Sequence, residues 1–219
     1  WSVGVTSTDA LRLWTQSNFG EDLIFAARGG SLFFWDATDA LTTRGVLLSS
    51  ETGASNVPVK VNTLLVSDNR FVFCFGTNVL GSTDLDPLLL RWSDQENALN
   101  WTPSSTNQAG DLRLSKGSEI ITAIQGRQEI LVWTDSALYA LQYVGAPAVW
   151  GSQTVGENLS IASTNAVAYA NGVAYWMGVG GFYRYDGRVQ TLPCTVKRYI
   201  FTDFNTEQYE QVFAGTNEA

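Results

Sequence analysis

The stretch NAVAYANGVAYWMGVGGFYRYDGRVQTLP, residues 165–193, carries the pattern that decides the fold. Short runs of aromatic and β-branched residues alternate there with turn residues, and Asn171-Gly172 is the strongest two-residue hairpin signal in the chain. We therefore predict a tight hairpin with a primed turn at this pair. Successive side chains of a strand point to opposite faces, so two pairs should each line one sheet face: Val167 with Tyr169, and Val173 with Tyr175.

The same arrangement occurs three more times earlier in the chain. Each copy has an apolar strand, a turn and an aromatic-rich strand: DLIFAARGGSLFFWD (22–36), RFVFCFGTNVLGSTDLDPLLLRWSD (70–94) and EILVWTDSALYALQY (129–143). With Trp35, Trp92, Tyr139 and Tyr185 as markers, the steps are 57, 47 and 46 residues. Propeller blades take about 40–50 residues each. The long first step contains a polar stretch, SSETGASN (49–56), which we interpret as an exposed insertion.

One further strand precedes each copy and another follows it. The preceding strands are LRLWT (11–15), VNTLLV (61–66), EIITAI (119–124) and NAVAYA (165–170), and the following strands are RGVLL (44–48), DLRL (111–114), WGSQTV (150–155) and RVQTLP (188–193). Four antiparallel strands repeated at a near-constant step are typical of a propeller blade. A β-sandwich and a β-solenoid remain alternatives, although a sandwich need not repeat in groups of four and solenoid coils are usually shorter.

The sequence therefore predicts an all-β protein, a β-propeller or partial propeller of four-stranded antiparallel meander blades. The blades are expected at residues 11–48, 61–115, 119–155 and 165–193, within a single region spanning 1–219. We expect this region to be part of a longer protein, with 197–219 as the start of a further unit. The only helix that the pattern favours is a short one around Thr206–Gln211.

Composition weakens several functional classes. Lys and Arg number 13 against 21 acidic residues, for a net charge of −8, which disfavours binding by neutralisation of DNA phosphates. The absence of histidine removes the most common general base and metal ligand at neutral pH. The two cysteines, Cys74 and Cys194, provide neither a metal site nor a disulfide framework, and we expect two separate buried thiols.

No group of residues predicts a catalytic, cofactor-binding or metal-binding site. Asp84, Asp86 and Asp94 are close in sequence but lack the pattern of a calcium loop, so solvated loop acids are the better interpretation. The GVGG run (178–181) lies inside a hairpin and is predicted to be a turn rather than a phosphate loop. Two tryptophans, Trp101 and Trp150, could either stack on sugars or pack between blades. We favour packing between blades.

Three stretches resemble structural proteins of short-tailed bacteriophages. They are RWSDQENALNWTPSSTNQAGDLRLSKGSEI (91–120), RQEILVWTDSALYALQYVG (127–145) and NGVAYWMGVGGFYRYDGRVQTLPCTV (171–196). The similarity is to the tail nozzle (tail tubular protein B) group and the related tail-hub proteins that retain packaged DNA. It covers most of the chain from about Asn69 onward, and the Trp-Ser-Asp…Trp-Thr-Pro pairing is its most specific part. The chains of that family are several times longer than this one.

That resemblance implies a virion structural protein and not an enzyme, with no cofactor. Its expected partners are further copies of itself in a ring, usually a hexamer, the portal and adaptor proteins, and DNA that passes through the channel without sequence-specific binding. No apolar run reaches the ~18 residues of a membrane helix. The alternative function is a carbohydrate-binding or carbohydrate-cleaving propeller, for example a tail adhesin. A third is a scaffold propeller that binds other proteins.

Overall fold

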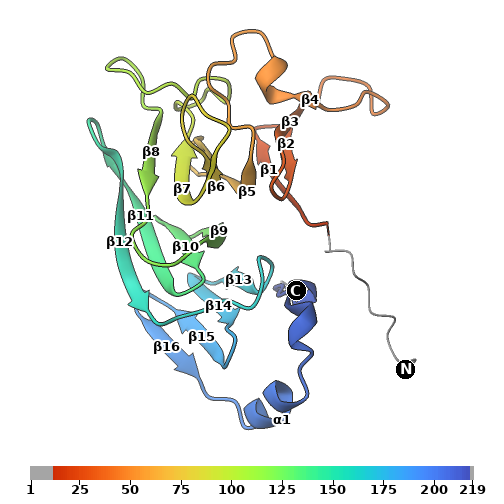
Figure 1. Cartoon of the computed structure of the whole chain (residues 1–219), viewed down its shortest axis with the longest axis vertical. Coiled ribbons are helices and arrows are strands. Elements are labelled where there is room, and N and C mark those ends of the chain that lie inside the picture. The colour runs from red at the N-terminus through yellow and green to blue at the C-terminus, as the bar shows by residue number, and fades with distance from the viewer. Residues whose placement is uncertain (1–11, 218–219) are drawn as a thin grey trace.

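The computed structural model describes residues 12–217, which form an all-β protein of four antiparallel sheets (Figure 1). Each sheet is a meander of four strands that are consecutive in the chain. Sheet 1 contains β1 (Trp14–Phe19), β2 (Asp22–Ala27), β3 (Leu32–Trp35) and β4 (Val46–Leu47). Sheet 2 contains β5 (Val61–Val66), β6 (Val72–Asn78), β7 (Leu85–Trp92) and β8 (Gly110–Arg113).

The second half of the chain repeats this organisation. Sheet 3 contains β9 (Ile120–Gln125), β10 (Ile130–Thr134), β11 (Ala137–Gly145) and β12 (Val149–Glu157). Sheet 4 contains β13 (Val167–Ala170), β14 (Val173–Met177), β15 (Phe182–Tyr185) and β16 (Val189–Leu192). The predicted four-stranded meanders are thus confirmed, and their limits agree with the expected blades to within three residues.

The sheets follow one another in a propeller-like arrangement, and none of them closes on itself (Figure 1). Three apolar clusters fill the spaces between neighbouring sheets. The first contains Ile24, Leu32 and Leu64, the second Phe73, Trp92 and Val132, and the third Leu131, Trp133 and Trp176. Aromatic rings are used heavily: Trp133 of sheet 3 and Trp176 of sheet 4 meet edge to face at 5.4 Å.

The hairpin predicted from Asn171-Gly172 is present. Both residues have positive φ, 52° and 83°, which is the signature of a type I′ turn. The turn joins β13 directly to β14, and the register pairs Tyr169 with Ala174. Val167 and Tyr169 consequently lie on the face that packs against sheet 3, and Val173 and Tyr175 lie on the opposite face.

Strand β1 shows why one expected boundary was wrong. The segment QSNF was predicted to be a turn, yet it continues the strand as far as Phe19. Its hydroxyl groups are used by the neighbouring sheet: Thr15 Oγ1 and Ser17 Oγ accept hydrogen bonds from the backbone N–H groups of Leu64 and Val66 at 3.1 Å each. A polar strand is stable here because it completes the hydrogen bonding of the free edge of β5. Leu11, the first residue predicted for this strand, lies outside the described residues.

The chain after sheet 4 contains more helix than the sequence indicated. Thr206–Gln211 is helical as predicted, in the 3₁₀ form, but an α-helix at Lys197–Thr202 (α1) was not foreseen. The segment then returns to sheet 4, where the N–H of Ala214 donates to the carbonyl of Asn165 at 2.7 Å. Residues 197–217 contain no extended strand, and a further sheet beyond them stays a prediction. No helix among the described residues is long and apolar enough to span a membrane.

The 49–56 stretch is largely exposed, as expected, although it is attached to the rest of sheet 2 at its end. Ser55 forms hydrogen bonds with Leu99 and Trp101 through its backbone, and a short 3₁₀ helix (Leu48–Ser50) leads into the stretch. The loop between β6 and β7 covers residues 79–84.

Candidate functional site

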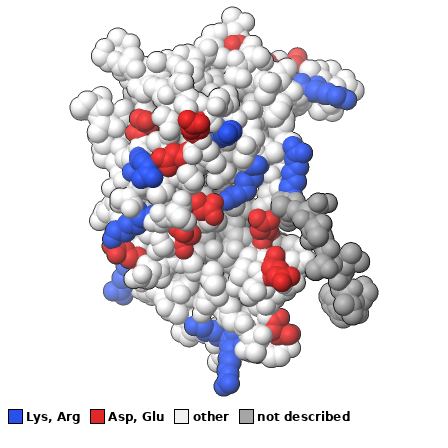
Figure 2. Space-filling model, in the orientation of Figure 1, with Lys and Arg blue, Asp and Glu red and all other residues white. Residues whose placement is uncertain are grey.

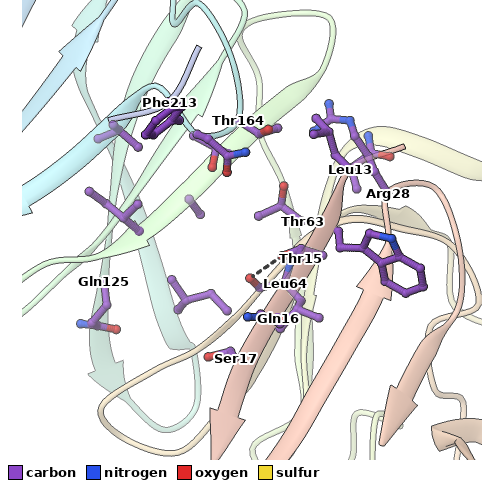
Figure 3. A pocket seen from close by; sticks show the side chains of 18 of the residues that line it. Leu13, Thr15, Gln16, Ser17, Arg28, Thr63, Leu64, Gln125, Thr164 and Phe213 are labelled. Carbon is purple, nitrogen blue, oxygen red and sulfur yellow. Dashed lines mark hydrogen bonds between the residues drawn. The ribbon is translucent and has the colours of Figure 1, made fainter. Parts of the chain in front are cut away.

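The inner strands of all four sheets surround a cavity of about 750 Å³ (Figure 3). Its walls are formed by β1, β5, β9 and β13 together with Phe213 and Ala214 of the C-terminal segment. Hydroxyl and amide side chains dominate the lining: Thr15, Gln16, Ser17, Asn62, Thr63, Thr122, Gln125, Thr164 and Asn165. We call this space the axial cavity. Pockets of roughly 300–1,000 Å³ are the usual size for small-molecule sites.

Several of these polar groups are already paired within the protein. Thr15 Oγ1 lies within hydrogen-bonding distance of both the N–H and the carbonyl of Leu64 (Figure 3). Thr63 Oγ1 donates to the carbonyl of Ile121 at 3.3 Å and so connects β5 to β9. These hydroxyls link the free edges of neighbouring inner strands, and their role is structural.

Asn62 differs from them. The residue is 9% exposed and lines the axial cavity, and its amide is not among the buried side-chain atoms that lack a hydrogen-bond partner. The amide lies against Gly76 of β6, which adopts a positive φ of 58° at a shift in the register of the sheet. A Cβ at position 76 would be 2.7 Å from Asn62 Nδ2, so glycine is the residue that leaves room for this amide.

One polar group near the cavity is incompletely paired. Thr122 of β9 is 4% exposed and lines the cavity, but its hydroxyl is not such a group. Gln125 uses its Nε2 to hold the carbonyls of Gly126 and Glu129 in the β9–β10 turn, at 2.8 and 3.4 Å, while its buried Oε1 has no partner.

Arg28 is the only charged side chain among the lining residues. Its Nη1 donates to the carbonyl of Ile121 at 3.1 Å, and its Nη2 is 3.8 Å from Glu119 Oε2, so the guanidinium group is engaged in joining sheet 1 to sheet 3. Among residues 12–217, no Asp or Glu lines the cavity. The described lining therefore consists mainly of neutral hydrogen-bonding and apolar groups.

The three acids singled out from the sequence have separate structural tasks. Asp86 accepts from Arg113 Nε at 2.6 Å, and Asp94 accepts from the backbone N–H of Gln108 at 2.8 Å. Asp84 is exposed in the loop before β7. Burial acts to raise the pKa of Asp86, but hydrogen bonds and the charge of Arg113 outweigh it and leave that pKa below its ordinary value. Among residues 12–217 no group of three or more acids or cysteines is arranged to hold a metal ion.

The aromatic residues considered for sugar stacking are packing residues. Trp101 is 1% exposed and donates from Nε1 to the carbonyl of Ala98 at 2.7 Å. Trp150 is 5% exposed and meets Phe73 edge to face at 5.0 Å between sheets 2 and 3. The GVGG run is a turn, closed by a hydrogen bond from Gly178 to Gly181.

The Trp-Ser-Asp…Trp-Thr-Pro stretch, the most specific part of the phage-tail resemblance, is held to sheet 2 by side-chain hydrogen bonds. Arg91 is 2% exposed, and its Nη2 donates to the carbonyls of Asn56 and Trp101 at 2.7 and 3.3 Å. Burial lowers the pKa of this guanidinium group, and the group is satisfied by carbonyl oxygens. Trp92 Nε1 donates to the carbonyl of Gln108 at 2.8 Å. The motif thus fastens residues 91–108 to the 49–56 stretch.

Both cysteines are free thiols, as expected, but only one is buried. Burial raises the pKa of Cys74, an effect that the nearby Arg91 opposes, so this thiol is unreactive. Cys194 is half-buried just after β16, which corrects the expectation of two buried thiols.

Comparison with known proteins supports the fold alone. The chain is similar to the extracellular domain of a protein named as the one component system BT4673 from B. thetaiotaomicron, with 14% sequence identity and a TM-score of 0.51. The match covers 89% of this chain and 24% of that chain, so the chain spans about a quarter of that protein's domain. No family model matches the sequence, and no curated protein matches it.

Proposed function

We propose that this chain is a structural part of the tail of a short-tailed bacteriophage, a component of the nozzle or hub in the virion, and that it is not an enzyme. The observation that carries the proposal is the position of the resembling motif. Arg91, Trp92 and Trp101, in and next to the Trp-Ser-Asp…Trp-Thr-Pro stretch, are buried and hydrogen-bonded to backbone carbonyls, which supports a role in rigidity rather than chemistry. A wall around packaged DNA requires this kind of stiffness.

The surface charge is compatible with DNA passing by without being held. The net charge is −8, and acidic and basic side chains are interspersed over the face shown in Figure 2 without a continuous basic patch. Binding to DNA regardless of sequence depends on cations that neutralise phosphates. A wall with this charge balance lets the genome slide, because it repels phosphates weakly.

Sheet 1 supplies a surface for assembly. Its face away from sheet 2 carries Trp14, Phe25 and Phe33, in which consecutive rings lie 6.1 and 5.5 Å apart, and Leu47 extends the row. Trp14 is 54% exposed and Leu47 is 41% exposed. These aromatic residues therefore do not pack between sheets. In the full-length protein we propose a homo-oligomeric ring, a hexamer as the resemblance implies, that contacts the portal and adaptor.

Electron cryo-microscopy of virions that contain the full-length protein tests the proposal. Density for the four-sheet arc, repeated around the tail axis below the portal, is the expected result. Density at the tips of side fibres, or no copy of the protein in the particle, would remove the tail nozzle and hub assignment.

The alternative, a carbohydrate-cleaving propeller, receives no support from the axial cavity. Hydrolysis of a glycosidic bond usually requires two carboxyl groups on either side of it, and none of the described residues that line this space is an Asp or Glu. Incubating the protein with common oligosaccharides should therefore release no reducing ends. Turnover abolished by neutralising one carboxylate would contradict the structural proposal.

A further inference from the structure

We propose that a small pocket between sheets 2 and 3 binds a single neutral sugar ring, with Trp150 as the hydrogen-bond donor and Gln125 as the acceptor. This goes beyond the tail function and does not depend on it. The pocket has a volume of about 200 Å³, and its walls come from the β5–β6 turn, the β9–β10 turn and strands β11 and β12. We call it the turn pocket. It is distinct from the axial cavity, although Gln125 lines both.

The argument begins with the indole of Trp150. This residue is 5% exposed and lines the turn pocket, and its Nε1 is a buried donor without a hydrogen-bond partner. Leaving such a group unpaired destabilises a protein by roughly 1–3 kcal/mol. The ring packs against Phe71, Phe73 and Tyr143, with centroids 5.7, 5.0 and 5.5 Å away. A phenylalanine would make ring contacts of the same kind without the unpaired N–H, so packing alone does not account for a tryptophan here.

Gln125 supplies the complementary group from another strand. Its Oε1 is also buried without a partner. Its Nε2 donates to the carbonyls of Gly126 and Glu129 at 2.8 and 3.4 Å, and these two contacts fix the orientation of the amide, because its oxygen would be repelled there. The turn pocket is thus lined by a residue with an unpaired donor from β12 and a residue with an unpaired acceptor from β9.

The β9–β10 turn beside this acceptor is held firmly in place. The N–H of Gly126 donates to the carbonyl of Glu129 at 2.8 Å, and the N–H of Arg127 donates to the hydroxyl of Tyr169 at 3.0 Å. A wall that is ordered before binding loses little conformational entropy when a ligand enters.

The charged side chains of the lining indicate a ligand without net charge. Asp68, Arg127 and Glu129 all line the turn pocket. Glu129 is close to Tyr185, whose pKa is raised to about 12 by burial and then by this negative charge. Asp68 and Arg127 are exposed, and neither belongs to an ion pair among residues 12–217. One charge of each sign remains, so an ion of either sign would meet a like charge.

A sugar ring satisfies these requirements. Each of its hydroxyl groups can both donate and accept, so neighbouring hydroxyls can accept from Trp150 and donate to Gln125. The volume lies below the roughly 300–1,000 Å³ of most small-molecule sites, which favours one ring over an oligosaccharide. Tyr143 is 41% exposed and adds an apolar ring surface to the lining for the C–H groups of the sugar.

The primary experiment is a titration of the ¹⁵N-labelled 219-residue protein with glucose, galactose, mannose and N-acetylglucosamine, followed through the indole N–H signals. At least one sugar should move the Trp150 signal downfield in a saturable manner, because this N–H gains a hydrogen bond. The Trp133 signal is the internal control and should stay in place. Its Nε1 is likewise buried without a partner, but Trp133 does not line the turn pocket.

Two matched pairs of variants test the two groups separately. Trp150→Phe should weaken binding about tenfold, whereas Trp133→Phe deletes the same atoms elsewhere and should leave the affinity unchanged. Gln125→Met should also weaken binding. Tyr169→Phe releases the same turn at Arg127 but keeps the Gln125 oxygen, and should leave the affinity unchanged. Backbone amide signals of residues 126–129 report binding in all four variants. The indole titration needs no variant, so one that fails to fold leaves that test intact.

Three results would overturn the inference. The first is a Trp150 signal that responds to none of the four sugars, which would leave a water molecule as its partner. The second is an equal shift of the Trp150 and Trp133 signals. The third is a saturable shift only with glucuronate or N-acetylglycinamide, which represent an anion and a peptide group. The tail proposal is tested on virions and its failure is therefore distinguishable, since a protein absent from the tail can still bind a sugar and a tail component can fail to bind one.

Discussion

Sheet 1 and sheet 4 are the first and last of the four sheets, and both are four-stranded meanders. They differ in how much of the outer face the rest of the chain covers. On the aromatic outer face of sheet 1, the guanidinium group of Arg12 lies over the Trp14 ring, 5.5 Å from its centroid. The outer face of sheet 4 is partly covered by the chain that follows it: Phe182 packs against Phe201 of α1 with centroids 5.6 Å apart, and residues 212–216 line one pocket together with Tyr175 and Leu192. Each sheet has two faces, and the end sheets lack a neighbour on one of them.

This difference shows what can happen to the outer faces of the first and last sheets, which have no neighbouring sheet to cover them. A bare apolar sheet face is either covered by the same chain or left to contact another protein. At sheet 4 the chain supplies the cover with α1 and the segment after Gln211. At sheet 1 the stacked rings of Trp14, Phe25 and Phe33 remain accessible. We therefore expect sheet 1 to be the end that contacts a partner.

Of the changes that we predict, removal of residues 197–219 should have the largest effect on stability. It uncovers the outer face of sheet 4 and so makes it similar to the outer face of sheet 1. Loss of the half-buried Ile200, Phe201 and Val212 should lower the free energy of unfolding by about 3 kcal/mol. Urea denaturation measures that change, and fluorescence of a dye that binds apolar surfaces should rise. An unchanged unfolding midpoint would show that the segment is not a cover.

Equivalent phenylalanines at the two ends provide a matched pair. Phe182→Ala removes a ring held between β15 and α1, and we expect a loss of about 2 kcal/mol. Phe33→Ala removes a ring that stacks on Phe25 alone, and we expect about 1 kcal/mol. Chemical denaturation of the two variants compares the ends directly, and equal losses would contradict the difference that we describe.

Trp14→Ser should barely alter stability, by about 0.5 kcal/mol or less, because the side chain is 54% exposed. Its effect should appear in binding instead. The variant should give a weaker signal with the apolar dye and weaker association with any partner of the assembled tail. Tyr175→Ser, at the covered end, is the control and should leave that association unchanged.

Acidification should act on interior sheet 3 through Asp135, and also on sheet 1, where hydrogen bonds from Thr38 lower the pKa of Asp36. Burial acts to raise the pKa of Asp135 in sheet 3, but hydrogen bonds from the Ser118 hydroxyl and N–H, at 2.6 and 2.8 Å, leave it below the ordinary value. A lowered folded-state pKa contributes stability that is complete above about pH 4 and is lost as the pH falls through the folded value. The slope of melting temperature against pH between 4 and 2 should be shallower in Asp135→Asn, and the chain lacking 197–219 should keep the normal slope.

Much of the fold could be predicted from local patterns in the sequence. Turn chemistry at Asn171-Gly172 and the recurrence of aromatic strands predicted four meanders and most strand boundaries. The end of β1 was predicted wrongly because its hydroxyl groups are paired with β5, 49 residues away in the chain. This contact is not visible in a short window of sequence.

The candidate site was harder to predict from the sequence than the fold. Asn62 and Thr122 are unremarkable residues of predicted strands, and nothing near them in the sequence marks a site. Only the packing of four sheets brings their strands around one cavity.

The sequence by itself determined the repeated four-stranded unit, because turn geometry and side-chain alternation act over a few neighbouring residues. The tertiary structure alone decided which sheet faces are covered, where the axial cavity lies and which polar groups remain unpaired. Those properties depend on how each sheet is placed against the next, and contacts between residues such as Thr63 and Ile121, 58 positions apart, establish that placement.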